Sequence, residues 1–177
     1  YFETERKSLD INHQWDVNEN LTVNTLLYWS DVYRDYWRFQ VDNPASLAAN
    51  RWIYNDTVQG NNRSFERYGA ETRAVLKNQL FGISGEAELG FRYLNETLDD
   101  VTVRADRAAP RTPRAGDGIA SDRQDTAEAF AVFAQNRFNM TDRFAVTPGV
   151  RVEHYTQERV NNRNLAQEAK TRNTEVI

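Results

Sequence analysis

The chain has 177 residues, 22 basic and 26 acidic side chains, a net charge of −4 and a mean hydropathy of −0.78. This balance gives no reason to expect nucleic acid as a partner, and the absence of cysteine excludes disulfide scaffolds, zinc–thiolate sites and cysteine nucleophiles. No run approaches the roughly 18 apolar residues that a membrane helix needs, whereas a membrane β-barrel stays possible because only alternate residues of each strand meet lipid.

Six segments alternate apolar and polar side chains with the period of two that is typical of β-strands. In the first, Leu9, Ile11 and Trp15 share one face, while Asp10 and Asn12 share the other. The fifth is less regular because apolar residues occur at both parities. The segments are residues 8–17, 21–30, 67–77, 86–96, 127–138 and 143–155.

Short and long connections alternate along the chain. The short ones form hairpin turns, the first of them the Asn18-Glu19-Asn20 step, where asparagine tolerates left-handed backbone. In an up-and-down sheet this alternation places all short turns at one end of the strands and all long connections at the other. The long connections are residues 41–62 and 97–125, and residues 157–174 are interpreted as a third long loop.

Pro148 lies inside the sixth segment and cannot donate a backbone hydrogen bond to a neighbouring strand. We therefore expect a bulge or another irregularity there, beside the conformationally permissive Gly149.

A soluble β-sandwich also alternates apolar and polar residues, but three features favour a membrane barrel. The segments have about ten residues, which matches the roughly 9–11 of a tilted membrane strand. Their polar faces carry dense rows of charged side chains. Aromatic residues cluster near the segment ends, as in interfacial girdles. These aromatic residues are Trp15, Tyr33, Tyr36, Trp37, Tyr68, Tyr93, Phe130, Phe138 and Phe144.

The predicted fold class is therefore all-β: an antiparallel, up-and-down transmembrane β-barrel segment of about six strands. Because the smallest membrane barrels have about eight strands, we expect the closing strands to lie elsewhere in a longer protein. The start at Tyr1 without a leader, and the apolar run that begins at the end of 173–177, agree with this expectation.

The step Thr147-Pro148-Gly149-Val150-Arg151, followed by Glu153, resembles a strand in the barrels of TonB-dependent outer-membrane receptors. Residues 130–135 resemble the usual hairpin partner of that strand. Residues 173–177 are similar to the lead-in to their next strand. Residues 90–97, with the arginine- and proline-bearing loop after them, look like the ferric dicitrate branch, a ferric-siderophore receptor branch.

This resemblance implies that residues 1–177 are part of a TonB-dependent receptor barrel of about 22 strands in the bacterial outer membrane. The plug domain, the remaining strands and the N-terminal segment that contacts TonB would lie outside the chain. Such receptors import a ferric siderophore or ferric citrate with energy delivered through TonB. The ferric chelate is a transported ligand, so no resident cofactor is expected, and the lipid of the outer membrane is the other partner.

An anionic ferric chelate calls for guanidinium groups, which grip carboxylates in bidentate fashion, together with aromatic partners. The alternative for each loop arginine is that it is solvated or paired with a nearby aspartate. The charged rows closer to the turns, such as Glu71, Arg73 and Glu88, are expected to form ion pairs across neighbouring strands or against a plug domain. The candidate ligand-binding residues are Arg34, Tyr36, Trp37, Arg38, Arg104, Arg107, Arg111 and Arg114.

Two other functions stay open: a soluble β-rich module that binds a ligand or carbohydrate, and a passive porin fragment. An enzyme is not expected, because Glu86 and Glu88 lie two residues apart in a row of charges without a neighbouring nucleophile or histidine. A metal site is not expected either, because His13 and His154 fall on the apolar parity.

Overall fold

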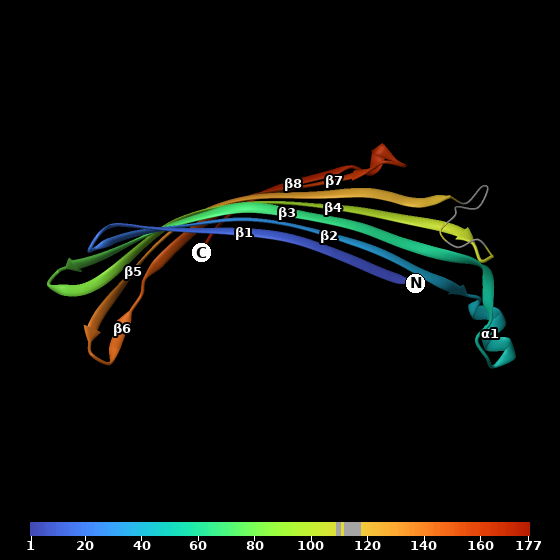
Figure 1. Cartoon of the computed structure of the whole chain (residues 1–177), viewed down its shortest axis with the longest axis horizontal. Helices are drawn as coiled ribbons and strands as arrows, with labels where there is room; N and C mark the ends of the chain where they lie inside the picture. The colour runs from blue at the N-terminus through green and yellow to red at the C-terminus, as the bar shows by residue number, and fades with distance from the viewer. Residues whose placement is uncertain (109–110, 112–117) are drawn as a thin grey trace.

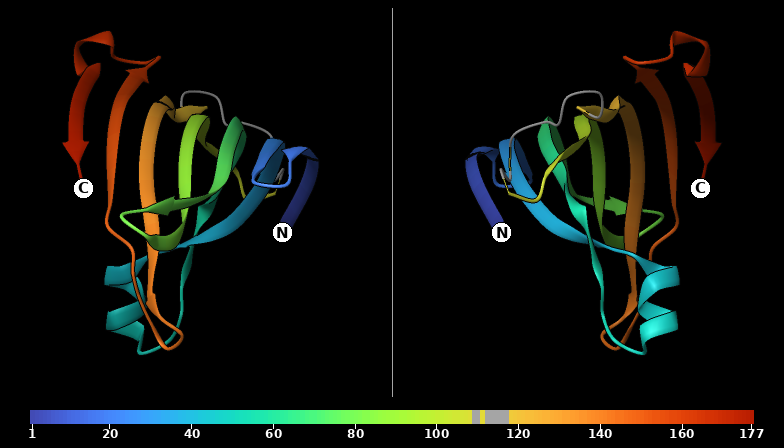
Figure 2. Two further views of the ribbon diagram at one scale, coloured as in Figure 1. Left: turned by 90° about the vertical axis from the view of Figure 1, so that its left-hand side faces the viewer. Right: turned by 90° about the vertical axis from the view of Figure 1, so that its right-hand side faces the viewer.

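The structure is a computed structural model that describes residues 1–108, 111 and 118–177. It is dominated by one antiparallel sheet in the order β1-β2-β3-β4-β5-β7-β8, with the short strand β6 paired to β5. Figure 2 shows β1 and β8 at opposite edges of this curved sheet. The elements are β1 (Phe2–Asn18), β2 (Leu21–Val41), α1 (Asn43–Ala49), β3 (Tyr54–Leu80), β4 (Ile83–Asp106), β5 (Ile119–Thr141), β6 (Phe144–Val146), β7 (Gly149–Asn161), the 3-10 helix η1 (Leu165–Gln167) and β8 (Ala169–Val176).

The predicted all-β, up-and-down architecture is confirmed. The predicted placement of short turns at one end of the strands and long connections at the other is also confirmed. Figure 1 shows the short turns between β1 and β2, β3 and β4, and β5 and β6 at one end, with α1 and the longer connections at the other. In the first turn the Asn18 side-chain oxygen accepts hydrogen bonds from the backbone N–H groups of Asn20 and Leu21, at 2.9 and 3.0 Å. Neither helical segment among the described residues has the length and apolar character needed to cross a membrane.

The predicted strand lengths were too short at the long-connection end. β2 continues to Val41 and β3 begins at Tyr54. β4 continues to Asp106, and β5 begins at Ile119. Residues 54–62 of the first predicted loop, and residues 97–106 and 119–125 of the second, are therefore strand. In these extensions polar side chains occupy both faces, so no hydrophobic alternation marks them, although their backbones still pair regularly.

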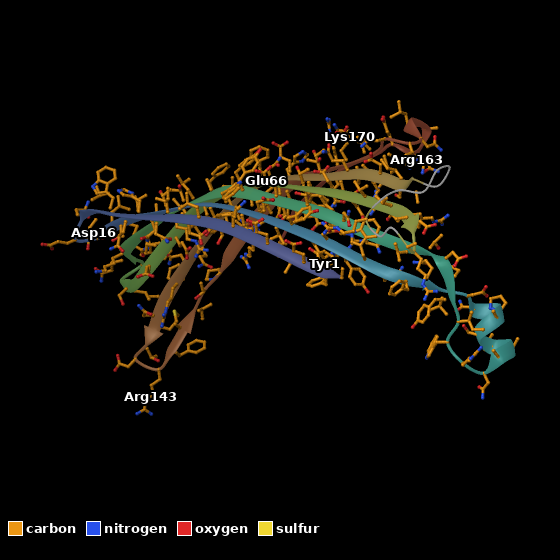
Figure 3. The ribbon with its side chains drawn as sticks, turned by 45° about the vertical axis from the view of Figure 1, so that its right-hand side comes forward. Tyr1, Asp16, Glu66, Arg143, Arg163 and Lys170 are labelled. Carbon is orange, nitrogen blue, oxygen red and sulfur yellow. The ribbon has the colours of Figure 1, made fainter. Side chains whose placement is uncertain are left out.

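The predicted third loop, residues 157–174, was also wrong. β7 runs to Asn161, and residues 169–176 form β8, which pairs with β7 from Val152↔Val176 to Arg159↔Ala169. Both faces of β8 are mostly polar, and its strand conformation follows from this pairing. The sheet thus has eight strands in place of the six expected, because β8 is added and the sixth predicted strand is divided into β6 and β7. Figure 3 shows the side chains of this edge, including Lys170, far from those of Asp16 and Arg143 at the short-turn end.

The expected irregularity at Pro148 is confirmed. The segment from Arg143 to Tyr155 divides into β6, which ends at Val146, and β7, which begins at Gly149. The carbonyl of Pro148 still accepts a hydrogen bond from the backbone N–H of Asn136, at 3.0 Å. The strand therefore keeps its direction while the residue that lacks a donor is left out of the regular pairing.

We call the two sides of the sheet the charged face and the apolar face. The charged face holds the even-numbered residues of β1, β2 and β4 and the odd-numbered residues of β3, β5, β7 and β8; the apolar face holds the others. On the apolar face, Leu89 and Val132 are each 60% exposed, as expected of a surface that no other described part of the chain covers. The buried apolar cluster is small and lies near the long-connection end, at Trp37, Val58 and Ala105.

An aromatic row crosses the apolar face and separates an apolar band from a polar zone. Phe130 packs against Tyr93 with ring centroids 4.8 Å apart, and the Tyr93 hydroxyl donates to Glu128 at 3.1 Å. The Trp29 indole N–H donates to Glu66 at 2.9 Å. The apolar band spans about nine residues per strand, which matches the roughly 9–11 that cross a bilayer. The band ends where aromatic rings turn their polar atoms toward carboxylates, as at a membrane interface.

Three glycines lie directly opposite an aromatic residue on the next strand, and the aromatic ring covers the glycine. The pairs are Trp37↔Gly60, Tyr28↔Gly69 and Phe133↔Gly90. A Cβ atom at any of these glycines would overlap the opposing ring. Each ring thus fills the space that a glycine leaves on a strand, which protects its backbone and fixes the local register.

Replacement of Gly90 by valine should therefore destabilise the sheet by about 1–3 kcal/mol, because the new side chain must displace the Phe133 ring. The measurement is thermal unfolding of the full-length protein in detergent. The matched control is Ala87→Val on the apolar face of the same strand, where a side chain already projects. Equal unfolding temperatures for the two variants would contradict the proposed role of the Gly90–Phe133 pair.

Candidate anion-binding surface

Cross-strand pairing arranges the charged face into rows that run from strand to strand. The row nearest the long connections contains Arg38 of β2, Gln59 of β3 and Arg104 of β4, since Gln59 pairs with both arginines. Arg38 and Arg104 are exposed. Two guanidinium groups thus flank one amide on neighbouring strands, an arrangement that can donate several hydrogen bonds to an anion.

A second arginine row lies four residues closer to the apolar band. It contains Arg34, Arg63, Asp100 and Arg123 on β2, β3, β4 and β5. The Asp100 carboxylate forms ion pairs with Arg63 at 3.1 Å and with Arg123 at 3.2 Å. The row thus holds three guanidinium groups and one carboxylate, which pairs with two of them, so the positive charge of the row is only partly neutralised.

Arg34, Arg38 and Arg104 form no ion pair with a carboxylate within the described part of the chain. The Nε atom of Arg34 is also buried and has no hydrogen-bond partner there. Together with the partly neutralised row at Asp100, these side chains leave hydrogen-bond donors and positive charge available to a ligand. We call Arg34, Arg38, Arg63, Arg104 and Arg123 the arginine surface.

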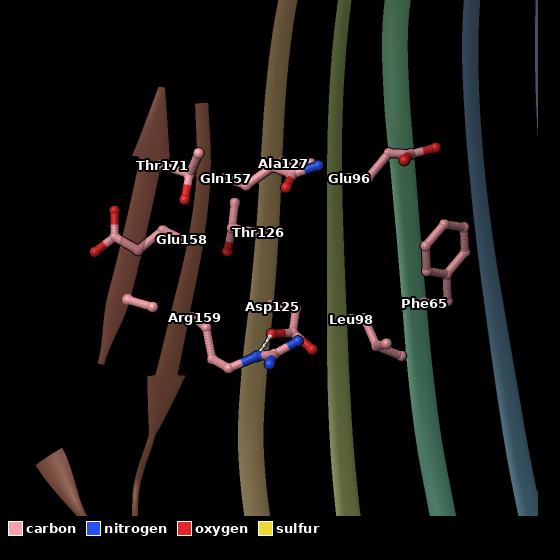
Figure 4. A pocket seen from close by; sticks show the side chains of 11 residues that line it. Phe65, Glu96, Leu98, Asp125, Thr126, Ala127, Gln157, Glu158, Arg159 and Thr171 are labelled. Atoms are coloured by element: carbon pink, nitrogen blue, oxygen red, sulfur yellow. Dashed lines mark hydrogen bonds and ion pairs between the residues drawn. The ribbon is translucent and has the colours of Figure 1, made fainter. Parts of the chain in front are cut away.

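The row below the arginine surface ends in a second ion-pair cluster. Asp125 of β5 contacts Arg123 at 3.0 Å and Arg159 of β7 at 2.5 Å. The hydrogen bond that the Arg159 guanidinium donates to the Asp125 carboxylate raises the pKa of Arg159 above its already high value. This pair lies in a hollow of about 420 Å³ on the charged face, which Figure 4 shows across β3, β4, β5, β7 and β8.

The structure divides the predicted site residues between the two faces. Arg34, Tyr36, Arg38 and Arg104 share the charged face. Trp37 lies on the apolar face, where it packs over Gly60. The division follows from the strand conformation, because neighbouring residues of a strand point to opposite faces. Trp37 is therefore a core residue of this end of the sheet rather than a companion of Arg38.

Arg107 and Arg111 also contact the apolar face. The Arg107 guanidinium lies 5.6 Å from the centre of the Phe39 ring. Arg111 forms an ion pair with Asp35 at 2.9 Å and lies 4.7 Å from the centre of the Tyr1 ring. These two arginines thus bind the connection after β4 to the sheet, away from the arginine surface. Arg114 lies outside the described residues.

Sequence reasoning missed the part of the surface that lies within the predicted loops. Asn61 and Arg63 of β3, Arg123 of β5 and Arg159 of β7 all lie on the charged face. A signal was present, because Gln59, Asn61 and Arg63 continue the parity of the charged residues further along β3. However, odd or even position in the sequence tells which face a side chain occupies only when the segment is known to be a β-strand.

The deeper charged rows form ion pairs both between neighbouring strands, as expected and as seen for Arg73 and Glu88, and within one strand. Arg73 contacts Glu71 and Glu88, and Arg151 contacts Glu153 at 2.7 Å. Nearby, the Phe133 ring is approached by the guanidinium groups of Arg73 and Arg151, at 5.7 and 5.8 Å from its centre. These rows are nearly neutral and join β3, β4, β5 and β7. No group of three or more histidine or acidic side chains suited to a metal ion occurs in the described ranges.

The model of the TonB-dependent receptor-like β-barrel family matches residues 1–176. The chain belongs to this family. The paired strands, the exposed apolar band and the charged rows described above are parts of this barrel domain.

Solved receptor structures share the fold. The unliganded ferric citrate transporter FecA matches with a TM-score of 0.75 and 16% identity over 99% of this chain and 24% of that one. The closed form of the ferric-catecholate import receptor Fiu from E. coli K12 matches with a TM-score of 0.70 and 16% identity over 100% of this chain and 30% of that one. The chain thus spans about a quarter to a third of the length of these receptors.

A match of another kind occurs among curated proteins. An alpha-1,4-glucan:maltose-1-phosphate maltosyltransferase of Cereibacter sphaeroides is 29% identical over 109 residues, which are 58% of this chain and 16% of that protein. This match covers too little of either chain to indicate an activity.

Replacement of Arg111 by alanine should leave the nearly buried Asp35 carboxylate without its partner and lower the stability by about 1–3 kcal/mol. Thermal unfolding of the full-length protein measures this loss. Arg107→Ala is the control, because it removes only a contact with the exposed Phe39 ring. Asp35→Asn should recover part of the loss in the Arg111→Ala background; an unchanged unfolding temperature for Arg111→Ala would contradict the structural role of the pair.

Proposed function

We propose that this chain is part of an outer-membrane receptor that takes up an anionic ferric chelate, such as ferric citrate, with energy delivered through TonB. The observation that carries the proposal is the arginine surface, which faces the long-connection end of the sheet in a chain of the TonB-dependent receptor family. Ferric citrate presents carboxylate oxygens, which guanidinium groups bind through paired, charge-assisted hydrogen bonds.

Within this proposal, Arg34, Arg38 and Arg104 are the residues that touch the chelate. Arg63 and Arg123 add positive charge while they hold Asp100, and Tyr36 offers an aromatic ring with a hydroxyl on the same face. Trp37, Arg107 and Arg111 are not ligand contacts in this arrangement, because they pack on the apolar face. Arg114 stays a candidate on its residue type alone.

Two solved neighbours support a ferric chelate as the ligand class. FecA is a ferric citrate transporter and Fiu is a ferric-catecholate import receptor, so both ligands are negatively charged iron complexes. A passive porin would also offer a polar lumen, but the arginine surface concentrates one sign of charge at one end, which favours binding of an anion.

The double substitution Arg38→Gln and Arg104→Gln should weaken ferric citrate binding by the full-length protein about 10- to 100-fold, since two charge-assisted contacts are lost. Titration of the detergent-purified receptor with ferric citrate, followed by intrinsic fluorescence, measures this change. Arg107→Gln removes the same charge on the apolar face and should bind normally. Unchanged affinity in the double variant, or an equal loss in the control, would remove the arginine surface from the proposal.

The outer-membrane location has its own test. The exposed apolar band should make the full-length protein dependent on detergent or lipid, and removal of detergent should cause aggregation. A monomeric and folded protein in buffer without detergent would instead favour the soluble ligand- or carbohydrate-binding alternative.

A further inference from the structure

The connection between β2 and β3 carries two large apolar side chains that the rest of the described chain leaves uncovered. Leu47 is 83% exposed and Trp52 is 74% exposed. Both line a hollow of about 410 Å³ whose walls all come from residues 43–52. Figure 1 shows α1, which belongs to this connection, beyond the end of the sheet that holds the long connections. Two large apolar side chains gathered at one hollow, in place of single scattered ones, indicate an interaction site.

Local hydrogen bonds fix the shape of this hollow. The Asp42 side chain caps α1 by accepting a hydrogen bond from the backbone N–H of Ala45 at 3.0 Å. The Ser46 hydroxyl accepts from the backbone N–H of Ile53 at 2.8 Å and donates to its carbonyl at 3.2 Å. The backbone N–H of Asp42 also donates to the carbonyl of Ile53, at 2.9 Å. The two ends of the connection are thus joined, and a preformed site loses less entropy when a ligand binds.

The other side chains that line the hollow are polar. Asn43 and Asn50 each offer an amide that can both donate and accept hydrogen bonds, and both residues are exposed. Arg51 is the one charged residue of the lining, and it forms no ion pair with another described residue. The hollow therefore combines a flat aromatic surface, neutral hydrogen-bonding groups and one positive charge.

This combination fits a saccharide. A pyranose ring has a side of C–H groups, which packs on the face of an aromatic ring, and a rim of hydroxyl groups, which exchange hydrogen bonds with amides. The volume lies near the lower end of the roughly 300–1,000 Å³ of small-ligand sites and suits a single sugar unit of a chain. A protein partner would need about 800 Å² on each side, more than one connection of this length offers.

We propose that the connection between β2 and β3 binds an acidic saccharide, with one sugar ring on Trp52 and the carboxylate of a uronic acid on Arg51. The guanidinium group binds a carboxylate through paired, charge-assisted hydrogen bonds, so the charge of the lining selects an acidic sugar over a neutral one. The site goes beyond the proposed uptake of a ferric chelate. It lies in the connection rather than on the charged face, and it holds a sugar chain outside the receptor without transporting it.

Saturation-transfer NMR of two sugars measures this binding on the full-length receptor in detergent. The probes are trigalacturonate, which carries a carboxylate on each sugar, and maltotriose, which is neutral. Trigalacturonate should bind in the roughly millimolar range and maltotriose more weakly. Trp52→Ala should weaken the binding of both sugars about three- to tenfold, whereas Arg51→Gln should weaken that of trigalacturonate alone by a similar factor. Trp52→Phe keeps an aromatic ring and should recover part of the loss.

Leu165→Ala is the matched control. Leu165 is 67% exposed in the connection between β7 and β8, so its replacement should leave both sugar affinities unchanged. Ferric citrate should bind normally to the Trp52→Ala and Arg51→Gln variants, because the two sites are separate. A receptor that binds trigalacturonate but not ferric citrate would therefore contradict the proposed function and leave the saccharide site intact.

The absence of trigalacturonate binding to the unaltered receptor would overturn the inference, and so would unchanged affinity in the Trp52→Ala variant or an equal loss in the Leu165→Ala control. Equal weakening of both sugars by Arg51→Gln would overturn the assignment of an acidic sugar. Self-association of the receptor that Trp52→Ala abolishes, without sugar binding, would replace the saccharide by a second copy of the chain. A loss of ferric citrate affinity in the Trp52→Ala variant would overturn the separation of the two sites.

Discussion

Backbone hydrogen bonding between neighbouring strands is the interaction on which the rest of the structure depends. The pairing of β3 with β4 runs without interruption from Leu80↔Ile83 to Thr57↔Asp106. Such an unbroken register preserves the assignment of side chains to faces along the whole strand, since a slip by one residue would exchange the faces. The parity that places Leu76 in the apolar band therefore also decides, sixteen residues away, that Gly60 lies under Trp37 and not on the arginine surface.

The side chains reinforce this register where the backbone alone would be weakest. Glycine adds no side-chain contact to a sheet, yet Gly60, Gly69 and Gly90 are each covered by an aromatic ring from the opposite strand. At Gly90 the covering ring of Phe133 is itself contacted by guanidinium groups from β3 and β7. A glycine, an aromatic ring and two arginines thus link four strands of a sheet whose described part has a small buried apolar cluster.

The sequence was informative where one side of a strand meets an apolar environment and the other meets water. Within the apolar band, the alternation of Leu9, Ile11 and Trp15 with polar residues correctly predicted a β-strand, the face of each side chain and the hairpin with the next strand. Beyond the aromatic row both faces are polar, so the alternation disappears while the strand continues. Most of β8 and the outer parts of β3, β4 and β5 were consequently assigned to loops. Their strand conformation is imposed by the neighbouring strand, which a local pattern does not reveal.

The same limit explains the partial success with the candidate site. Eight residues were grouped by residue type and nearness in sequence, but Arg38 and Trp37 are neighbours in the chain and lie on opposite faces of the sheet. Conversely, Arg34 and Arg123 are distant in sequence and share one row. The arrangement of the arginines in rows also determines where positive charge accumulates on the charged face. Deep on the charged face, arginines and glutamates neutralise each other. Toward the long connections, the ion pairs that the five arginines form within the described residues involve two carboxylates, those of Asp100 and Asp125. An anion that approaches from that end therefore meets an attractive potential that weakens with depth, so the charge distribution favours capture at the arginine surface over passage along the face.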